Sequence, residues 1–241
     1  MAKFVIGDIH SGRKALEQLL ERANIQREDQ LIFLGDYVDA WSDAFETVEF
    51  LIGLRERHRC IFLRGNHDEL CREWMVTGKE NPQWLAHGGV ATRASYLKAG
   101  KSNWEPHLNF YESLLNTHLD EANRLYLHAG YTNLKGIAYE YFEQLFYWDR
   151  TLWELAKAID PSLRPEDEAF PKRLTHYDEI FIGHTPLSKK GIVAPQKRAN
   201  VWNMDTGAAF KGALSIMNVD TKEYWQSDPV YTLYPGEEGR K

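Results

Sequence analysis

The sequence predicts an α/β fold in which two mixed β-sheets pack face to face and helices flank them. Three short apolar runs are the main indication, because each ends at a glycine followed by polar residues: GDIH at 7–10, GDYVD at 35–39 and GNHD at 65–68. The intervals between them, of 24 and 25 residues, have room for one helix and one strand each. Later strand-like segments alternate more strongly between apolar and polar residues and are not separated by long helices. They indicate a second, antiparallel sheet.

In the first half of the chain, strands are expected at Lys3–Ile6, Leu31–Leu34 and Cys60–Leu63. Apolar residues at helical spacing predict one helix over 12–23 and another that begins after Ser42. This βαβαβ succession predicts parallel strands joined by right-handed crossovers. The loops at the carboxyl ends of such strands meet in a shared crevice, and all three motifs fall on those loops.

In the second half, further strands are expected at Leu125–Leu127, Ile180–Ile182, Val201–Met204 and Leu214–Val219. The polar stretch that precedes them interrupts the pattern. We interpret residues 1–241 as a single domain that carries an insertion or lid at about 84–123. The charged tail from Pro235 to Lys241 is expected to be frayed.

Composition limits the classes of function. The chain has 241 residues and a formal net charge of −6, which argues against nucleic acid as the main partner. No apolar run approaches the roughly 18 residues of a membrane helix, and no signal peptide is expected before the first strand. The two cysteines, Cys60 and Cys71, lack the spacing of a zinc or redox pair. We therefore expect a cytoplasmic protein with reduced thiols and no membrane partner.

The polar residues of the motifs form one candidate metal centre at the carboxyl ends of the strands. The segments LHAG at 127–130 and IGHTP at 182–186 add two histidines to the aspartates, histidines and asparagine of the first three motifs. Such ligands, without a thiolate, suit a borderline or hard divalent metal. We expect two ions that share the carboxylate of Asp36. The expected ligands are Asp8, His10 and Asp36 for one ion and Asp36, Asn66, His128 and His184 for the other. The alternative is that the aspartates only cap helices, which explains a lone motif better than the whole array.

The order of the five motifs resembles the calcineurin-like metallophosphoesterases, from Val5 to about Phe210. Within that superfamily the chain is most similar to the serine/threonine protein phosphatases of bacterial and phage type. The resemblance implies a four-layer sandwich, in agreement with the strand pattern. It also implies two divalent ions, with manganese expected first and iron or zinc as alternatives.

Two such ions would favour an anionic phosphate ester, because their charge exceeds that of two carboxylates. They lower the pKa of water from about 16 towards 7, so that a bridging hydroxide is available for in-line attack. His67 follows Asn66 directly and would face the leaving group, with Asp39 as its carboxylate partner. The resemblance assigns the role of general acid to the matching pair. A purely structural role for His67 is the alternative.

Arg150 in YWDRTLW matches a phosphate-binding arginine of the bacterial phosphatases, although a surface ion pair is the alternative. The chain also departs from the family pattern, because Ala40-Trp41 stands where Arg-Gly is usual after GDYVD. Trp41 is either buried or stacks on an aromatic group of the substrate. The residues considered as substitutes for the absent arginine are Lys14, Arg64, Arg72 and Arg93.

The leading functional hypothesis is a phosphomonoester hydrolase of serine/threonine phosphatase type, acting on a phosphorylated protein or a small phosphate ester. The second is a hydrolase of dinucleoside polyphosphates such as diadenosine tetraphosphate. A non-catalytic scaffold of the same fold is the remote alternative.

Overall fold

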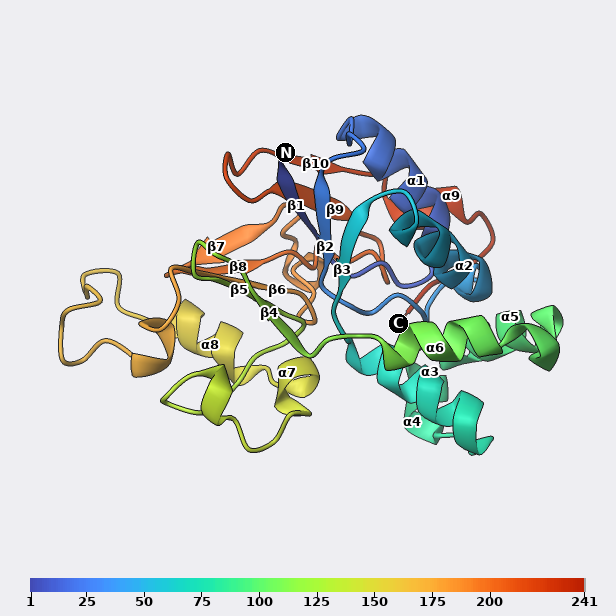
Figure 1. Ribbon diagram of the computed structural model, residues 1–241, viewed down its shortest axis with the longest axis horizontal. Coiled ribbons are helices and arrows are strands. Elements are labelled where there is room, and N and C mark those ends of the chain that lie inside the picture. Colours follow the sequence, from blue (N-terminus) through green and yellow to red (C-terminus); the bar gives the residue numbers. More distant parts are fainter. Residues whose placement is uncertain (241) are drawn as a thin grey trace.

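The computed structural model describes residues 1–240 and consists of two five-stranded sheets packed face to face (Figure 1). The first sheet has the strand order β10-β9-β1-β2-β3, and the second has the order β4-β5-β6-β8-β7. The strands of the first sheet are β1 (Lys3–Ile6), β2 (Gln30–Phe33), β3 (Arg59–Phe62), β9 (Ser215–Asn218) and β10 (Tyr224–Gln226). Those of the second are β4 (Thr117–Leu119), β5 (Arg124–Leu127), β6 (Glu179–Ile182), β7 (Gln196–Arg198) and β8 (Val201–Asn203).

The first sheet confirms the predicted βαβαβ unit. Strands β1, β2 and β3 are parallel, with Val5 opposite Ile32 and Ile32 opposite Ile61. Their carboxyl ends therefore lie at one edge of the sheet, where the three motifs begin. The segment 214–219, expected in the second sheet, instead forms β9 and pairs antiparallel with β1.

The second sheet differs from the expected antiparallel arrangement. Its central strands β5, β6 and β8 are parallel, and only the edge strands β4 and β7 run antiparallel to their neighbours. Parallel neighbours need a crossover that covers the sheet. Helices α7 (Leu145–Trp148) and α8 (Thr151–Ala158) supply one between β5 and β6. Both sheets are therefore mixed.

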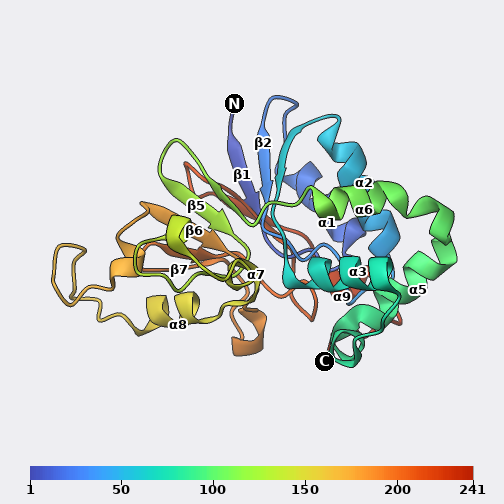
Figure 2. The same ribbon diagram turned by 60° about the horizontal axis from the view of Figure 1, so that its bottom comes forward.

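The remaining helices gather on the side of the first sheet, whereas α7 and α8 flank the second (Figures 1 and 2). They are α1 (Arg13–Arg22), α2 (Ala44–Arg55), α3 (Asn66–Thr77), α4 (Pro82–Trp84), α5 (Val90–Ala99), α6 (Glu105–Glu112) and α9 (Val230–Leu233). The segment Leu85–Gly89 joins α4 to α5 through a kink at His87 and Gly88, where the backbone is not helical.

Three apolar clusters confirm a four-layer sandwich. The cluster between the two sheets includes Val5 and Ile32 from the first and Tyr126 and Phe181 from the second, all fully buried. A larger cluster fills the space between the first sheet and its helices, and a third lies between the second sheet and α7 and α8. Burial on both faces explains the short, continuously apolar strands.

The segment predicted as an insertion, about 84–123, contributes to the core beside the first sheet. Its aromatic side chains Tyr96, Trp104, Phe110 and Tyr111 are buried there. Only the beginning of the segment, around Trp84, borders the cleft described below. The segment is thus anchored by a large apolar contact at one end of the molecule.

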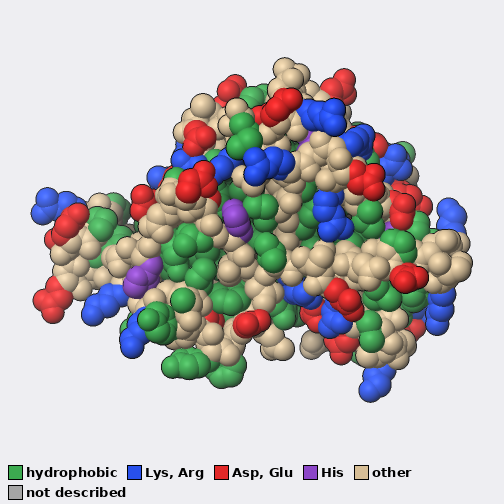
Figure 3. Space-filling model, viewed as in Figure 1, with side chains coloured by type: hydrophobic (Ala, Val, Ile, Leu, Met, Phe, Trp, Pro, Cys, Tyr) green, Lys and Arg blue, Asp and Glu red, His purple; other side chains and the backbone are tan. Residues whose placement is uncertain are grey.

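The surface carries charges of both signs spread over the face shown in Figure 3, with hydrophobic side chains gathered along its lower edge. The loop that precedes α7 exposes Tyr141 and Phe142, at 85% and 70% of their surfaces. In residues 1–240 no helix combines the length and apolar character needed to cross a bilayer.

Candidate metal centre and catalytic cleft

The candidate site lies where the carboxyl ends of strands from both sheets meet. Asp8 and His10 follow β1, Asp36 and Asp39 follow β2, and Asn66 begins the helix after β3. The second sheet contributes His128 after β5 and His184 after β6, so every predicted metal ligand comes to one place. This edge is where parallel strands present their loops.

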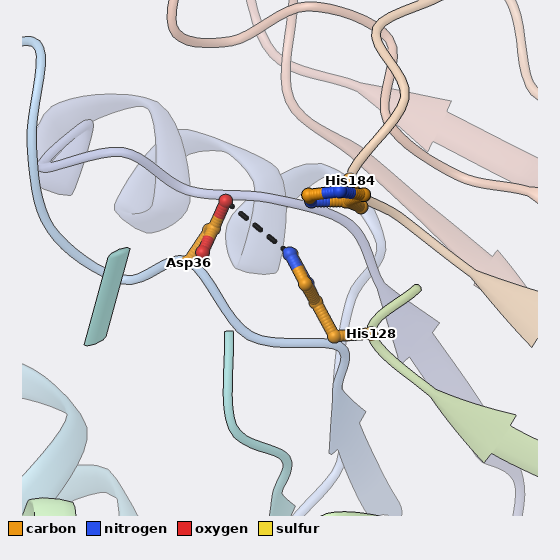
Figure 4. A group of neighbouring side chains, drawn as sticks. All are labelled: Asp36, His128 and His184. Atoms are coloured by element: carbon orange, nitrogen blue, oxygen red, sulfur yellow. Dashed lines mark ion pairs between the residues drawn. The ribbon is translucent and has the colours of Figure 1, made fainter. Parts of the chain in front are cut away.

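Asp36 lies between two groups of side chains that could each hold a metal ion. Asp8, His10 and Asp36 form one group, and Asp36, His128 and His184 form the other. Asp36 Oδ2 is 3.5 Å from His10 Nε2 and 3.3 Å from His128 Nε2, the pair joined by the dashed line in Figure 4. Its Oδ1 accepts a hydrogen bond from the backbone N–H of His67 at 3.0 Å. One oxygen of Asp36 is therefore held by the backbone, while the other faces both groups.

The histidine rings are oriented for ligation through Nε2. His10 Nδ1 donates to the carbonyl of Val38 at 3.1 Å, and His128 Nδ1 donates to the carbonyl of Leu34 at 2.8 Å. A hydrogen bond from one ring nitrogen to a carbonyl leaves the other as a free lone pair, the usual arrangement of metal-bound histidine. Asn66 Oδ1 lies 3.3 Å from His128 Nε2 and so belongs to the second group.

His184 gives direct support for a bound cation. Its Nε2 is buried and finds no hydrogen-bond partner within residues 1–240. An orphaned buried nitrogen is costly unless a ligand satisfies it. The backbone N–H of His184 meanwhile donates to Asp8 Oδ2 at 3.0 Å, which joins the two groups. Gly183 allows this approach, since a Cβ there would lie only 1.9 Å from Asp8 Oδ1.

Burial and close charges shift the pKa values of the candidate ligands in opposite directions. Burial, and then the charge of Asp205, raises the pKa of Asp8 well above its usual value. Burial, the largest influence, would also raise the pKa of Asp36, but the charges of His128, His67 and His10 together outweigh it, so the pKa lies well below normal. Burial lowers the pKa of His128, yet Asp36 more than compensates and raises it to about 9. The buried carboxylates, the imidazoles and the orphaned Nε2 of His184 form a donor set that fits the implied metals.

The backbone of the motifs is strained. Five residues of the motifs have φ values between 51° and 82°, a region that residues other than glycine seldom adopt: His10, Asp36, Asp39, Ala40 and His184. Each costs on the order of 1–3 kcal/mol, and such strain gathers at functional sites. The rest of the fold therefore holds these side chains in position against a local preference for other conformations.

Asp68 supports the centre, although its role was not identified from the sequence. Its carboxylate accepts hydrogen bonds at 2.8 Å from the backbone N–H groups of Asp36, Tyr37 and Gly65. These bonds fix the turn that carries Asp36 against the start of α3. This role could have been predicted from the sequence, because an acidic residue at the third position of a helix often accepts hydrogen bonds from the backbone that precedes the helix.

The predicted His67–Asp39 pair is formed, with His67 Nδ1 donating to Asp39 Oδ2. Trp84 Nε1 donates to the same carboxylate oxygen at 2.8 Å, and the hydroxyl of Thr92 donates to the other at 2.7 Å. Both supporting residues belong to the segment 84–123, whose contact with the catalytic pair has no signature in the sequence. His67 Nε2 points away from Asp39 and receives a hydrogen bond at 2.9 Å from Arg240.

A cleft of about 570 Å³ opens over these groups. Arg150 lies on its wall, exposed, and donates at 3.3 Å to the carbonyl of His184 and to the hydroxyl of Thr185. The other cations that line the cleft are Lys189, Lys190 and Arg240. Its aromatic lining comes from Trp84, Trp148 and Phe210.

The four residues considered as substitutes for the absent arginine lie elsewhere. Arg64 and Arg72 both pair with Glu69, and Arg93 pairs with Glu80 at 2.6 Å. Lys14 packs over the Tyr234 ring. The cleft lining includes none of these four.

Trp41 is fully buried and does not face the cleft. Its ring stacks on Tyr234 with centroids 5.5 Å apart, and its Nε1 donates to the carbonyl of Ala208 at 2.8 Å. Of the two alternatives for Trp41, burial is therefore correct and stacking on a substrate is not. Trp41 therefore serves the packing of the C-terminal segment, which places Arg240 in the cleft.

Comparisons with known proteins agree with this geometry. A bis(5′-nucleosyl)-tetraphosphatase (asymmetrical) of Geobacillus is 26% identical, covering 88% of this chain and 87% of its own length. Serine/threonine-protein phosphatase 1 of Salmonella typhimurium is 23% identical, covering 90% of this chain and 91% of its own length. A serine/threonine phosphatase structure from Saccharomyces cerevisiae superposes with a TM-score of 0.61 at 14% identity, over 99% of this chain and 82% of that one. The sequence pattern of the calcineurin-like phosphoesterases matches residues 3–210, so the protein belongs to the calcineurin-like phosphoesterase family.

Proposed function

We propose that the protein is a metal-dependent phosphomonoester hydrolase of serine/threonine phosphatase type. One observation carries the proposal: the two donor groups that share Asp36 and the His67–Asp39 pair face the same cleft. Divalent ions bound by these donors would supply a water of lowered pKa as nucleophile and charge stabilisation for the phosphoryl oxygens. No covalent bond between the protein and phosphate is required.

The residues of the chain then divide the remaining work. His67 gives a proton from Nε2 to the leaving oxygen, while Asp39 accepts a hydrogen bond from Nδ1 and holds the ring in position. Trp84 and Thr92 hold the Asp39 carboxylate and keep it from turning away. Arg150 donates to phosphoryl oxygens from the wall of the cleft, where its planar group suits a phosphate.

Two exposed aromatic side chains on the loop that leads to Trp148 favour a protein substrate. Tyr141 and Phe142 are exposed at 85% and 70%, and the short helix that follows places Trp148 on the cleft wall. Exposed apolar groups that are close together mark interaction surfaces. A phosphorylated polypeptide could contact this surface while its phosphate enters the cleft.

The second candidate is a dinucleoside polyphosphate hydrolase, and the basic lining of the cleft favours it. The four cations on its walls exceed what one phosphate group needs to be held. A polyphosphate chain would use more of them, and Trp148, exposed at 46%, offers a surface for a base to stack. The similarity to nucleosyl tetraphosphatases over most of the chain supports the same reading.

The test is release of product by the manganese-loaded protein from three substrates: p-nitrophenyl phosphate, a phosphothreonine protein and diadenosine tetraphosphate. The highest kcat/KM on the phosphoprotein supports the first proposal, and the highest value on the dinucleotide supports the second. Zinc- and iron-loaded samples run in parallel identify the metal that supports turnover. No turnover on any substrate, with metal content confirmed, would leave the scaffold hypothesis.

A further inference from the structure

The C-terminal segment, expected to be frayed, is anchored beside the catalytic cleft. The Tyr234 hydroxyl donates to Asp43 Oδ2 at 2.9 Å. Glu237 accepts from the backbone N–H of Ser42 at 3.0 Å and from its hydroxyl at 2.7 Å. The backbone N–H of Arg240 donates to the carbonyl of Ala209 at 2.8 Å. The segment is therefore held at three successive points, two of them on the loop that follows Asp39.

Gly239 makes the last turn of this path feasible. Its φ is +65°, and a Cβ at this position would lie 2.8 Å from both the Ala209 carbonyl oxygen and the Trp41 ring. Only glycine fits so close to these two groups. The burial of Trp41 thus has a consequence for the site, because its ring forms the surface on which the chain turns towards the cleft.

The side chain of Arg240 enters the cleft, where Asp205 is the nearby carboxylate whose charge interacts with it. Within residues 1–240 its guanidinium forms no ion pair at contact distance, in contrast to Arg64, Arg72 and Arg93. Its guanidinium carbon lies 5.4 Å from the centre of the Phe210 ring, and its Nη1 donates to His67 Nε2 at 2.9 Å. A half-buried guanidinium that forms no close ion pair at this position is available to an anionic ligand.

Arg240 also passes near position 40, where the family pattern has an arginine and this chain has Ala40. A Cβ built on Gly88 would lie 3.2 Å from both Ala40 Cα and Arg240 Cγ, so the Arg240 side chain passes next to Ala40. Figure 2 shows the C-terminal end beside the helical turn that contains Gly88. A guanidinium carried by the tail therefore enters the cleft on the side of the loop that contains residue 40.

We propose that Arg240 binds the phosphate of the substrate and is supplied to the active site by the C-terminal segment. The inference rests on the proposed function in one respect, namely that the substrate is a phosphate ester. On binding, the guanidinium turns donors from His67 Nε2 to the phosphoryl oxygens, which its planar group suits as acceptors.

The test compares Arg240→Ala and Arg240→Lys with the matched control Arg198→Ala, each as the full chain loaded with manganese. Arg198 is exposed and donates to the carbonyl of Lys197, away from the cleft. The primary readout is the affinity for inorganic phosphate, measured by titration calorimetry. We expect Arg240→Ala to weaken phosphate binding and raise KM by about 10- to 100-fold, the range for a charged hydrogen bond. Arg240→Lys should weaken phosphate binding less than Arg240→Ala does, and the phosphate affinity of Arg198→Ala should equal that of the wild type.

Phosphate affinity that is unchanged in Arg240→Ala would overturn the inference, even if the pH–rate profile shifts, because that pattern assigns Arg240 to positioning His67. Failure of the manganese-loaded wild type to bind phosphate would also overturn it. Circular dichroism and metal analysis exclude misfolding and metal loss as causes. A wild type that cleaves no phosphate ester, while Arg240→Ala still weakens phosphate binding, would contradict the proposed function and leave the inference standing.

Discussion

The floor and the wall of the cleft are built in opposite ways. The floor consists of donors such as Asp8, Asp36 and His128, which are buried at strand ends and held by backbone groups. The wall consists of exposed or half-exposed cations such as Arg150 and Arg240, held by a few long-range contacts. In the proposed function, hydrolysis depends on the floor. The choice among phosphate esters would depend on the wall, which is formed by loops and the C-terminal segment and not by the sheets.

The largest expected effect is on the floor. Asp36→Asn removes the charged oxygen that faces both donor groups. We expect kcat to fall by more than about 10⁴-fold, the scale on which removing one member of a catalytic unit acts. Metal content per chain, measured by mass spectrometry of the purified protein, should fall as well. Asp228→Asn is the matched control, because Asp228 is an exposed partner of Arg22 and should leave both quantities unchanged.

His67→Asn separates proton transfer from metal binding. Loss of a general acid costs on the order of 10²–10⁴-fold when the leaving group is a poor one. We therefore expect a large loss on an alkyl phosphate and a much smaller one on p-nitrophenyl phosphate, whose leaving oxygen needs little protonation. Metal content should stay at the wild-type level. Equal losses on the two substrates would contradict the role of general acid.

Asp68→Asn tests the support beneath the floor. The amide can no longer accept all three N–H groups that Asp68 binds, and its own NH₂ would face one of them. Residues that hold metal ligands in place typically contribute about 10- to 100-fold to metal affinity. We expect a loss in this range, measured by competition with a chelating dye. An unchanged affinity would show that the Asp36 turn holds its shape without Asp68.

The floor was predictable from the sequence because its information is local. Each donor follows a short apolar strand, so the pattern that identifies the strand also locates the ligand at its end. The wall depends on contacts between distant segments, as when Glu237 binds Ser42 or Arg240 binds Ala209. The composition of the tail, Pro-Gly-Glu-Glu-Gly-Arg, indicates a frayed end, and nothing near it in the sequence reveals its partners. The pairing of β9 with β1 was missed for the same reason.

The exposed side chains of Tyr141 and Phe142 allow a test between the two candidate substrates, because a phosphoprotein could contact them and p-nitrophenyl phosphate is too small to need them. We expect Tyr141→Ser combined with Phe142→Ser to raise KM for a phosphoprotein by about 10-fold, since interface aromatics each contribute on the order of 1 kcal/mol or more. The kcat/KM for p-nitrophenyl phosphate should not change. Steady-state kinetics on both substrates makes the comparison. A double substitution of Leu119 and Tyr224 by serine, at exposed positions on other elements, serves as the control.

The smallest expected effect concerns the anchor of the tail. Glu237→Gln keeps one acceptor oxygen but loses the charge that binds the N–H and hydroxyl of Ser42. A single exposed hydrogen bond contributes about 0.5–1.5 kcal/mol, and Tyr234 and the backbone of Arg240 still hold the segment. We therefore expect KM for a phosphomonoester to rise by roughly 2- to 5-fold with kcat unchanged, because the guanidinium must be ordered again at each binding event. Glu121→Gln, remote from the cleft, is the control. A fall in kcat with KM unchanged would mean that the anchor acts on His67 and not on the phosphate.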